Sequence, residues 1–467
     1  MYWANFLHVY QPPTQKSIWV KRVADECYRK LFGGLLNIPN ARLTLNINSV
    51  LCELLERDGA SDVIKSIKEL VDRGNIELTG SAKFHAFLPL LPESEIKRQI
   101  LLNEEGLNKY FGKGWKKGGF FSPEMAYSKK VAKVAVSLGY KWIIIDEMAF
   151  PPEKKLEKNK IYDITGIEDF SVFFRERNFS FKILSASQIS TLPTIMRFLA
   201  PRFDKDEYTI TAMDGETFGH HRPGLENLLF DLLKKEEIKS IAIGDIFNYF
   251  KNHVKIEPRE STWASLPRDF KNNEPFSRWN NKDNQIQNYQ WRLTNLAIEI
   301  IGRDEKDKAR DVLDESLHSD QYWWSSAKPW WSLEMIERGA YDLKRVVLSA
   351  KKSTQEEKNE AEELYKKILF TGFEWQRSGF VDELSRAENE EVQERLEEKE
   401  KLFVTKDEYE DLIKTLTEQM HQSAESEEYH RASMLKDRIR ELGEEMNKME
   451  KNIKPESNPN GTGDLMF

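Results

Sequence analysis

Short apolar runs alternate with amphipathic stretches along residues 1–250 of this 467-residue chain. In the longer stretches, such as SDVIKSIKELVDRG (residues 61–74), apolar residues recur every three or four positions, which is typical of helices. Steady alternation of strand and helix predicts parallel pairing of the strands. The predicted strands are Trp3–His8, Arg42–Asn48, Asn75–Gly80, Gly118–Ser122, Lys141–Asp146, Phe170–Arg177 and Tyr208–Asp214, with a shorter candidate at Ser240–Asp245.

Seven or eight such units favour a closed β/α barrel over an open doubly wound sheet. Active sites of these barrels lie at the carboxyl ends of the strands. In this chain those ends carry mostly ionisable side chains, rather than the Gly, Ser and Lys of an ordinary surface loop. They are His8, Asn48, Glu77, His85, Glu124, Asp146, Glu147, Arg175, Asp214 and Glu216. A carboxylate-rich pocket is therefore predicted at this end of the barrel.

The strand pattern then gives way to about four helical stretches, which continue to Gly379. Seven of the twelve tryptophans fall between Trp263 and Trp331. Beyond Gly379 the chain is highly charged, and its end is polar with Pro and Gly. The sequence predicts a catalytic barrel over residues 1–265, a helical domain over 266–380, a charged helical segment over 381–453 and a disordered tail over 454–467.

The net charge of −8 argues against a general nucleic-acid binder, which would normally present a basic surface. The two cysteines, Cys27 and Cys52, fall on predicted helices, and so low a cysteine content fits a reducing compartment. The first residues lack the pattern of a signal peptide, and no run of eighteen apolar residues is present. A cytoplasmic protein without a membrane segment or a nucleic-acid partner is expected.

Two carboxylates follow predicted strands in unusual segments. Glu124 lies in GFFSPEMAYS (residues 119–128), and Asp214 lies in ITAMDGETFGHHRPG (residues 210–224), where Glu216 follows. Two carboxyl groups that face each other across a barrel mouth suit cleavage of a glycosidic bond, because one can attack the anomeric carbon while the other protonates the leaving oxygen. Taken singly, Pro-Glu is more often a helix opening, and Asp-Gly is more often a turn.

These segments and others resemble the motifs of glycoside hydrolase family 57, a group of α-amylases, 4-α-glucanotransferases and branching enzymes. The resemblance covers roughly residues 1–380 and touches all five short motifs of the family in order. The first four motifs match FLHVYQPP, GNIELTGSAKFHAFLPLLP, GFFSPEMAYS and MDGETFGHH, and STWASLP and LHSDQYWWSS together match the remainder. Tyr10 departs from the pattern, because it replaces the second histidine of the first motif. We expect this change to alter a hydrogen bond to the substrate rather than to abolish the chemistry.

The resemblance implies an α/β fold, an incomplete (β/α)7 TIM-like barrel followed by an α-helical bundle domain. It implies a retaining mechanism on α-glucans or maltooligosaccharides that needs no metal or other cofactor. Glu124 takes the place of the nucleophile, and Asp214 that of the acid/base. Substrate-binding roles are implied for His8, Glu77, His85, Glu216, Trp263, Asp320, Trp323 and Trp324. Alternatively, several of the tryptophans simply fill the interface between the barrel and the helices.

A second resemblance lies near the C-terminus, in the stretch LIKTLTEQMHQSAESEEYHRASMLKDRIREL (residues 412–442). It is similar to the UVR motif, a short antiparallel helical hairpin, and we expect the hairpin to span about residues 406–446. Such hairpins in other proteins mediate contacts between proteins, so a protein partner is one reading. The other is a solvated hairpin that packs on its own chain.

Three functional classes remain open. The first is a retaining enzyme that acts on α-glucans, the second a non-catalytic relative that binds a glucan or a protein, and the third a polysaccharide deacetylase. The last requires an Asp with two His at helical spacing, which neither His85 nor the His220–His221 pair supplies. The sequence separates neither hydrolysis from transfer or branching nor one oligomeric state from another. For the first class we expect a carboxyl separation of about 5–6 Å, and a pKa of Asp214 raised toward about 6 by Glu124 and partial burial.

Overall fold

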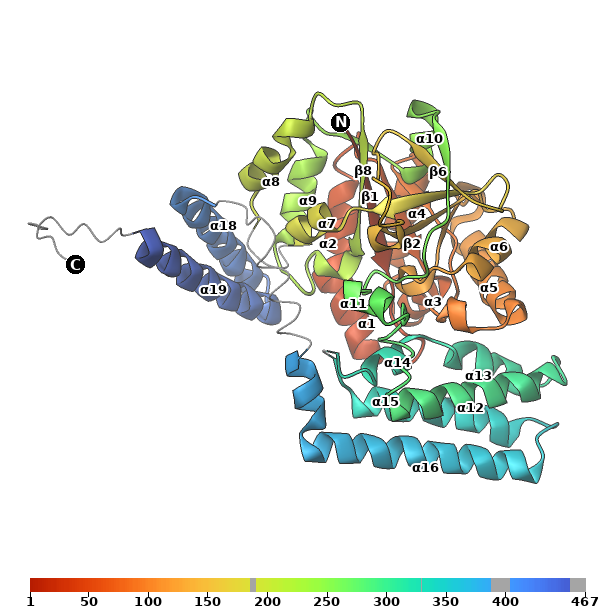
Figure 1. Cartoon of the computed structure of the whole chain (residues 1–467). Helices are drawn as coiled ribbons and strands as arrows, with labels where there is room; N and C mark the ends of the chain where they lie inside the picture. Colours follow the sequence, from red (N-terminus) through yellow and green to blue (C-terminus); the bar gives the residue numbers. More distant parts are fainter. Residues whose placement is uncertain (185–189, 329, 388–403, 454–467) are drawn as a thin grey trace, which may run out of the picture.

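The computed structural model describes residues 1–184, 190–328, 330–387 and 404–453 (Figure 1). The predicted disordered tail lies outside the described residues. The described strands are β1 (Tyr2–Val9), β2 (Leu43–Ile47), β3 (Ile76–Leu78), β4 (Gly119–Phe121), β5 (Trp142–Asp146), β6 (Ile161–Ile164), β7 (Ser171–Arg175), β8 (Tyr208–Asp214), β9 (Lys239–Ile241) and β10 (His253–Ile256).

Seven of these strands form the barrel. One sheet has the order β3-β2-β1-β8 and the other contains β7-β5-β4, and all of these neighbours pair in parallel. Backbone hydrogen bonds of 2.9 Å on both sides of Gly80 join the end of β3 to β4. Between β7 and β8 the link is a 2.7 Å hydrogen bond from Glu176 N to Ile210 O. The predicted incomplete (β/α)7 barrel is confirmed. It is least regularly paired between β7 and β8.

Three short strands depart from the prediction. β6 and β10 extend the second sheet beyond β7, with β6 antiparallel to β7, and neither was predicted. β9 pairs with the first residues of β1 and ends at Ile241, before the predicted end at Asp245. The chain turns there because Gly244 passes against the Glu77 carboxylate, where a Cβ would come within 2.1 Å of an oxygen. Close approach of a backbone to a side chain is a usual reason for glycine.

Alternating side chains of the strands fill the barrel. Ala4 and Phe6 of β1 and Ile210 and Ala212 of β8 belong to one interior apolar cluster. Because side chains alternate along a strand, the next inward positions are His8 and Asp214, which are also register partners between β1 and β8. The apolar packing of the barrel thus brings two polar residues side by side at its mouth.

Helices surround the barrel and then form a separate layer. The barrel helices are α1 (Ser17–Val23), α2 (Arg29–Leu35), α3 (Ser49–Arg57), α4 (Ser61–Asp72), α5 (Glu93–Phe111), α6 (Lys129–Ser137), α7 (Arg177–Leu184), α8 (Leu192–Leu199), α9 (Leu225–Leu233) and α10 (Ile246–Tyr249). The later ones are α11 (Pro267–Lys271), α12 (Gln285–Gly302), α13 (Ala309–Ser316), α14 (Asp320–Trp324), α15 (Leu333–Ser349), α16 (Gln355–Ser378), α18 (Lys406–Glu425) and α19 (Tyr429–Ile453). Among the described helices, none combines the length and apolar character needed to cross a bilayer.

The helical domain lies along one side of the barrel, with α16 farthest from it (Figure 1). Its core uses aromatic residues, since Trp291 stacks on Tyr322 with ring centroids 4.2 Å apart and Trp279 is fully buried. Ser319 N donates to His85 O at 2.9 Å, which fixes the start of α14 against the loop after β3. We propose boundaries near residues 265 and 380 for this domain.

The C-terminal hairpin has an apolar core of its own, formed by Val404, Tyr409, Leu416, Leu435 and Leu442. It lies beside α8 and α9 of the barrel (Figure 1). Arg431 of α19 pairs with Glu226 of α9, and both side chains are less than 10% exposed. The predicted hairpin is confirmed, and its Arg431 contacts the barrel of the same chain.

Candidate active site

The two predicted catalytic carboxylates lie where two different strands end, at the same end of the barrel. Glu124 lies in a turn of 3-10 helix, Pro123–Met125, directly after β4, and Asp214 ends β8. Glu124 has a left-handed backbone (φ 61°, ψ 16°), and His85 shares this feature with a φ of 56°. Such conformations are strained for residues other than glycine, and strain of this kind is concentrated at functional sites.

Both carboxylate oxygens of Glu124 are held. Trp263 Nε1 donates to Oε2 at 3.0 Å, and Ser319 Oγ donates to Oε1 at 3.1 Å. Burial, together with the charges of Asp320 and Asp214, raises the pKa of Glu124 to about 8 against the two hydrogen bonds, which lower it. The side chain is 15% exposed, so it is fixed yet accessible.

Asp214 has a more open position. Its side chain is exposed to the cleft but lies deep among protein atoms, and this desolvation raises its pKa to about 6 against the opposing charge of Arg175. The value agrees with the expectation, but the cause is burial and not the charge of Glu124, which was expected to contribute. The order of the two pKa values differs from the expectation. The acid/base Asp214 was expected to have the higher pKa and the nucleophile Glu124 to be ionised, whereas the pKa of Glu124 lies above that of Asp214. Near neutral pH the pair holds one proton between two coupled groups.

Two buried histidines connect Glu124 to the interior of the barrel. His8 Nδ1 lies 2.8 Å from Asn46 Oδ1, and its Nε2 lies 3.1 Å from Nε2 of His85. Nδ1 of His85 in turn lies 2.9 Å from Ser319 Oγ. Burial lowers the pKa of both imidazoles, that of His85 to about 4, so each carries a single ring proton at neutral pH.

The tautomers follow from this chain. With His8 donating from Nδ1 to the amide oxygen of Asn46, its Nε2 accepts from His85, and Nδ1 of His85 is left as an acceptor. Ser319 then has one proton and two acceptors, His85 and Glu124. An ionised Glu124 draws the hydroxyl proton toward itself, whereas a protonated Glu124 can donate to Ser319. The direction of the Ser319 hydroxyl is therefore tied to the charge of Glu124.

Tyr10 occupies the place where the family motif has a histidine. Its hydroxyl donates to Asp320 Oδ2 at 2.8 Å, and its ring stacks on His85 with centroids 4.0 Å apart. Its backbone N–H donates to Glu216 at 3.0 Å. Burial and the charge of Asp214 raise the pKa of Glu216 to about 8. Burial would raise the pKa of Asp320, but the hydrogen bond and charge of His318 lower it below its usual value.

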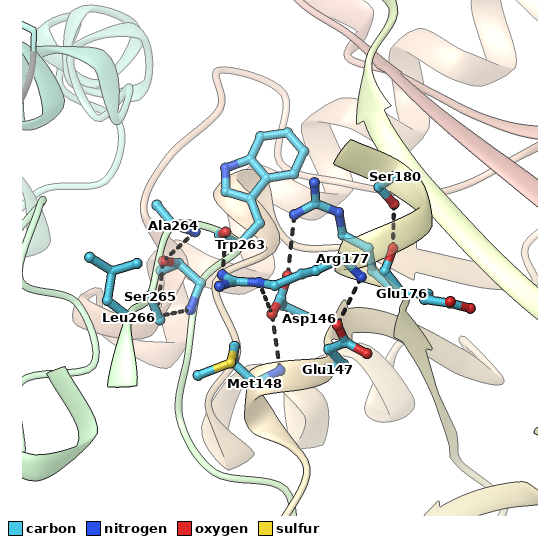
Figure 2. Close-up of polar contacts among 12 residues, drawn as sticks. Asp146, Glu147, Met148, Glu176, Arg177, Ser180, Trp263, Ala264, Ser265 and Leu266 are labelled. Carbon is cyan, nitrogen blue, oxygen red and sulfur yellow. Dashed lines mark hydrogen bonds and ion pairs between the residues drawn. The ribbon is translucent and has the colours of Figure 1, made fainter. Parts of the chain in front are cut away.

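A second set of polar contacts supports Trp263 from behind. Arg177 donates to the carbonyl of Trp263 at 2.6 Å and forms an ion pair of 2.7 Å with the buried Asp146 at the end of β5 (Figure 2). Asp146 also accepts from Met148 N at 3.0 Å. Because the backbone N–H of Trp263 donates to the carbonyl of Glu124 at 3.2 Å, this network fixes the indole beside the carboxylate.

The predicted site residues fall into two groups. His8, His85, Trp263, Asp320 and Glu216 lie around Glu124 and Asp214. Three others do not. Glu77 lies lower in the barrel, where it accepts from Gly244 N at 3.0 Å and from Thr44 at 3.1 Å, so its position gives no support to a substrate-binding role. Trp323 packs near the buried Trp279, and Trp324 lies near Trp330, with centroids 5.1 and 6.2 Å apart.

Sequence reasoning missed three residues that the site uses. Asn46 and Ser319 end the chain of hydrogen bonds through the histidines, and Arg177 supports Trp263. Ser319 stands inside the sixth segment, LHSDQYWWSS, and Arg177 was the last residue of a predicted strand. Asn46 alternates with Thr44 along β2, and a polar residue at an inward position of a barrel strand was a usable signal.

Comparison with known proteins places the chain in a family. The family model for glycosyl hydrolase family 57 matches residues 8–260, and the chain belongs to this family. It is similar to an α-amylase of Pyrococcus horikoshii, with 25% identity over 283 residues, 58% of this chain and 43% of that protein. It is also similar to α-amylase 1 of Dictyoglomus thermophilum, with 22% identity over 227 residues, 47% of this chain and 32% of that protein. The matches thus span less than half the length of both relatives.

Solved structures agree on the fold. A 4-α-glucanotransferase from Thermococcus litoralis aligns with a TM-score of 0.62 and 15% identity, over 74% of this chain and 59% of that one. A family 57 branching enzyme from Thermococcus kodakaraensis aligns with a TM-score of 0.61 and 16% identity, over 79% and 94%. A second family model, the UvrB/uvrC motif, matches residues 410–445 and confirms the motif predicted for the hairpin.

Proposed function

We propose that this protein is a retaining glycoside hydrolase or transglycosidase that acts on α-1,4-glucans, of the α-amylase or 4-α-glucanotransferase type. One observation carries the proposal. Glu124 and Asp214 lie where β4 and β8 end, at the same end of the barrel, and they are close enough for the charge of Asp214 to raise the pKa of Glu124. Two coupled carboxyl groups with one proton between them are the minimum that a double displacement requires.

In the first step, the Glu124 carboxylate attacks the anomeric carbon of the bound glucan. Asp214 gives its proton to the glycosidic oxygen, and the bond between that oxygen and the anomeric carbon breaks. Trp263 and Ser319 hold the two oxygens of Glu124, so the attacking atom needs little reorganisation. The proton shared by Glu124 and Asp214 must lie on Asp214 at this moment. A transfer from Glu124 to Asp214 places it there without a change in the total charge of the pair.

In the second step, Asp214 takes a proton from the acceptor, which attacks the anomeric carbon and frees Glu124. Water as the acceptor gives hydrolysis, and a sugar hydroxyl gives transfer. The covalent bond removes the negative charge of Glu124, which lowers the proton affinity of Asp214 and makes it the base. The exposed position of Asp214 leaves room for either acceptor.

Other polar groups are suited to binding the sugar. Asp320 is kept ionised by His318 and Tyr10, and it lies close enough for its charge to raise the pKa of Glu124. We assign it to a sugar hydroxyl near the bond that breaks. We assign His8, His85 and Trp263 to the same side of the sugar-binding site. Glu216 accepts a hydrogen bond from the backbone of Tyr10. A cytoplasmic location and a protein partner for the hairpin stay predictions.

Incubation with maltoheptaose tests the function. Shorter products alone indicate hydrolysis, and products both shorter and longer than the substrate indicate transfer. An unchanged substrate that still binds would favour the non-catalytic relative. Family membership favours glycosidic chemistry over the deacetylase alternative.

A further inference from the structure

A cavity of about 970 Å³ lies between the hairpin and the barrel. Its barrel wall comes from the start of α8 and from Pro223–Leu228 at the start of α9, and its other wall comes from α18 and α19. Asp214 and Trp330 also line it. We call this space the hairpin groove. Its volume is near the upper end of the roughly 300–1,000 Å³ that ligand pockets occupy.

The shape of the groove is fixed by close contacts between hairpin and barrel. Gly224 has a φ of +87°, and a Cβ there would come within 2.8 Å of Leu416 and 2.9 Å of Gln419 on α18. The buried pair of Arg431 with Glu226 fixes α19 in the same way. The backbone angle favours glycine at position 224, and the absence of a Cβ leaves room for the side chains of Leu416 and Gln419 against the barrel.

Carboxylates outnumber guanidinium groups in the lining of the groove. Six carboxylates line it: Asp214, Asp231, Glu408, Asp411, Asp437 and Glu441. Four of them form ion pairs with nearby basic residues, whereas Asp214 and Asp411 form none among the described residues. Only two guanidinium groups, those of Arg222 and Arg438, line the groove, and the pKa of His221 is lowered to about 4 by burial, which leaves that imidazole neutral. The described lining therefore has no excess of positive charge that would attract a phosphorylated or nucleic-acid chain.

The same lining suits a neutral chain of sugars. Carboxylates and the Gln419 amide accept hydrogen bonds from hydroxyl groups, and Gln419 Oε1 is buried without a hydrogen-bond partner among the described residues. Trp330 is 54% exposed and presents an aromatic ring to the groove, on which the C–H face of a sugar can stack. A basic peptide would also be attracted by the carboxylates. The presence of the proposed acid/base Asp214 in the lining favours a substrate chain over a peptide, because a bound glucan can continue from the groove to the reacting bond.

We propose that the hairpin groove binds a neutral α-glucan chain as an extension of the catalytic cleft on the side of Asp214. This inference rests on the proposed function and assigns a role to the hairpin within it. Short maltooligosaccharides that bind with one glycosidic bond beside Glu124 and Asp214 should make few contacts with the hairpin. Longer chains continue past Asp214 and contact α18 and α19. Loss of the hairpin should therefore weaken binding of long chains and spare short ones.

A pair of tryptophan substitutions on α18 tests this. Thr415 lines the groove, so Thr415→Trp should fill it, whereas its neighbour Lys414 is exposed and does not line it, so Lys414→Trp is the matched control. Both are placed in a Glu124→Gln background, and binding of maltotriose and of a maltooligosaccharide of more than ten units is measured by calorimetry. Thr415→Trp should weaken binding of the long chain about tenfold or more and leave maltotriose unchanged, which corresponds to the loss of a few hydrogen bonds. Lys414→Trp should change neither.

A second variant guards against misfolding. Asp411→Ala removes an acceptor instead of filling the groove, and it should weaken binding of the long chain in the same direction but by less. Equal affinity of the long chain for the parent, for a folded Thr415→Trp and for Asp411→Ala would overturn the groove and leave the catalytic proposal standing. The groove proposal would also be overturned if the protein binds oligolysine and neither substitution changes its affinity for the glucan. A parent protein that neither binds nor converts any glucan would overturn both proposals.

Discussion

The surroundings of the two carboxylates differ, because one side chain is held by hydrogen bonds and the other is exposed. Glu124 accepts hydrogen bonds from Trp263 and Ser319, and Ser319 in turn contacts one of two buried histidines, which are hydrogen-bonded to each other. Asp214 is exposed, and it opens into the groove that the hairpin completes. A group that must attack one atom at one distance gains from being fixed, whereas a group that serves a leaving sugar and then an acceptor needs space. We infer that the fixed carboxylate sets the chemistry and the open side of the site sets which acceptors are used.

Replacement of the fixed carboxylate should have the largest effect. Glu124→Gln keeps the size and can still accept from Trp263, but the neutral amide cannot attack the anomeric carbon. We expect kcat for maltoheptaose to fall by about 10⁴-fold or more. Circular dichroism and glucan binding should be unchanged. Full activity in a folded variant would remove Glu124 from the mechanism.

Replacement of the open carboxylate should have the second largest effect and should depend on the leaving group. Asp214→Asn removes the proton donor, and we expect maltoheptaose turnover to fall by about 10²–10⁴-fold. An activated aryl glucoside needs little protonation, so its glycosylation step should fall far less.

Glu216 supplies the control for this test. Its oxygen accepts from Tyr10 N and the Tyr28 hydroxyl, and an amide oxygen can accept both hydrogen bonds. Glu216→Gln should therefore keep activity within about tenfold. If Glu216→Gln rather than Asp214→Asn shows the leaving-group dependence, the acid belongs to Glu216.

The coupled pair predicts the pH profile. Only the form with one proton is productive, because two protons leave no nucleophile and none leaves no acid. With pKa values of about 6 and about 8, kcat/KM should rise through pH 6, stay high and fall through pH 8. A single limb between pH 4 and 9 would mean that only one carboxyl group titrates in the free enzyme.

Ser319→Ala sharpens the same profile with a smaller effect. The hydroxyl stabilises ionised Glu124, so its loss raises the pKa of Glu124 and should move the upper limb to higher pH by about one unit. We expect a loss of kcat of about tenfold. A purely structural role for Ser319 would lower kcat without moving the limb. Lys414→Trp, on the outer face of the hairpin, should leave the profile unchanged.

Tyr10→Phe should have the smallest effect. It removes the hydrogen bond to Asp320 but keeps the ring on His85, so we expect KM to rise by about two- to tenfold with little change in kcat. A large loss of kcat would show that Tyr10 acts on the reacting atoms. Tyr10→His, which restores the family residue, should then recover more activity than Tyr10→Phe.

Much of this arrangement could be predicted from the sequence, since it follows local patterns. Alternating apolar runs predicted β1 to β5, β7 and β8, and the polar residues after them predicted the side of the barrel that carries Glu124 and Asp214. β6 and β10 escaped because they mix polar with apolar positions and lie outside the regular alternation of strand and helix, with β6 antiparallel to β7. Runs of this mixed kind carry little periodic signal.

Partners from distant segments could not be predicted in this way. Ser319 reaches Glu124 from 195 positions away, and Arg431 reaches Glu226 from 205 positions away. Neither pair leaves a trace in the local pattern of either segment. The same holds for the order of the two pKa values, which depends on how deeply each group lies and on which donors surround it. The hairpin motif was predicted, but its seat beside Asp214 was not.

Detection of a covalent glycosyl-enzyme tests the central claim most directly. The Asp214→Asn variant should be glycosylated by an activated glucosyl donor, such as the fluoride, and then deglycosylated slowly, because the base for the second step is missing. Rapid quenching and mass spectrometry of the digested protein should then locate one added glycosyl residue on the peptide that contains Glu124. No adduct under conditions where the donor is consumed, or an adduct on any other carboxylate, would contradict the account.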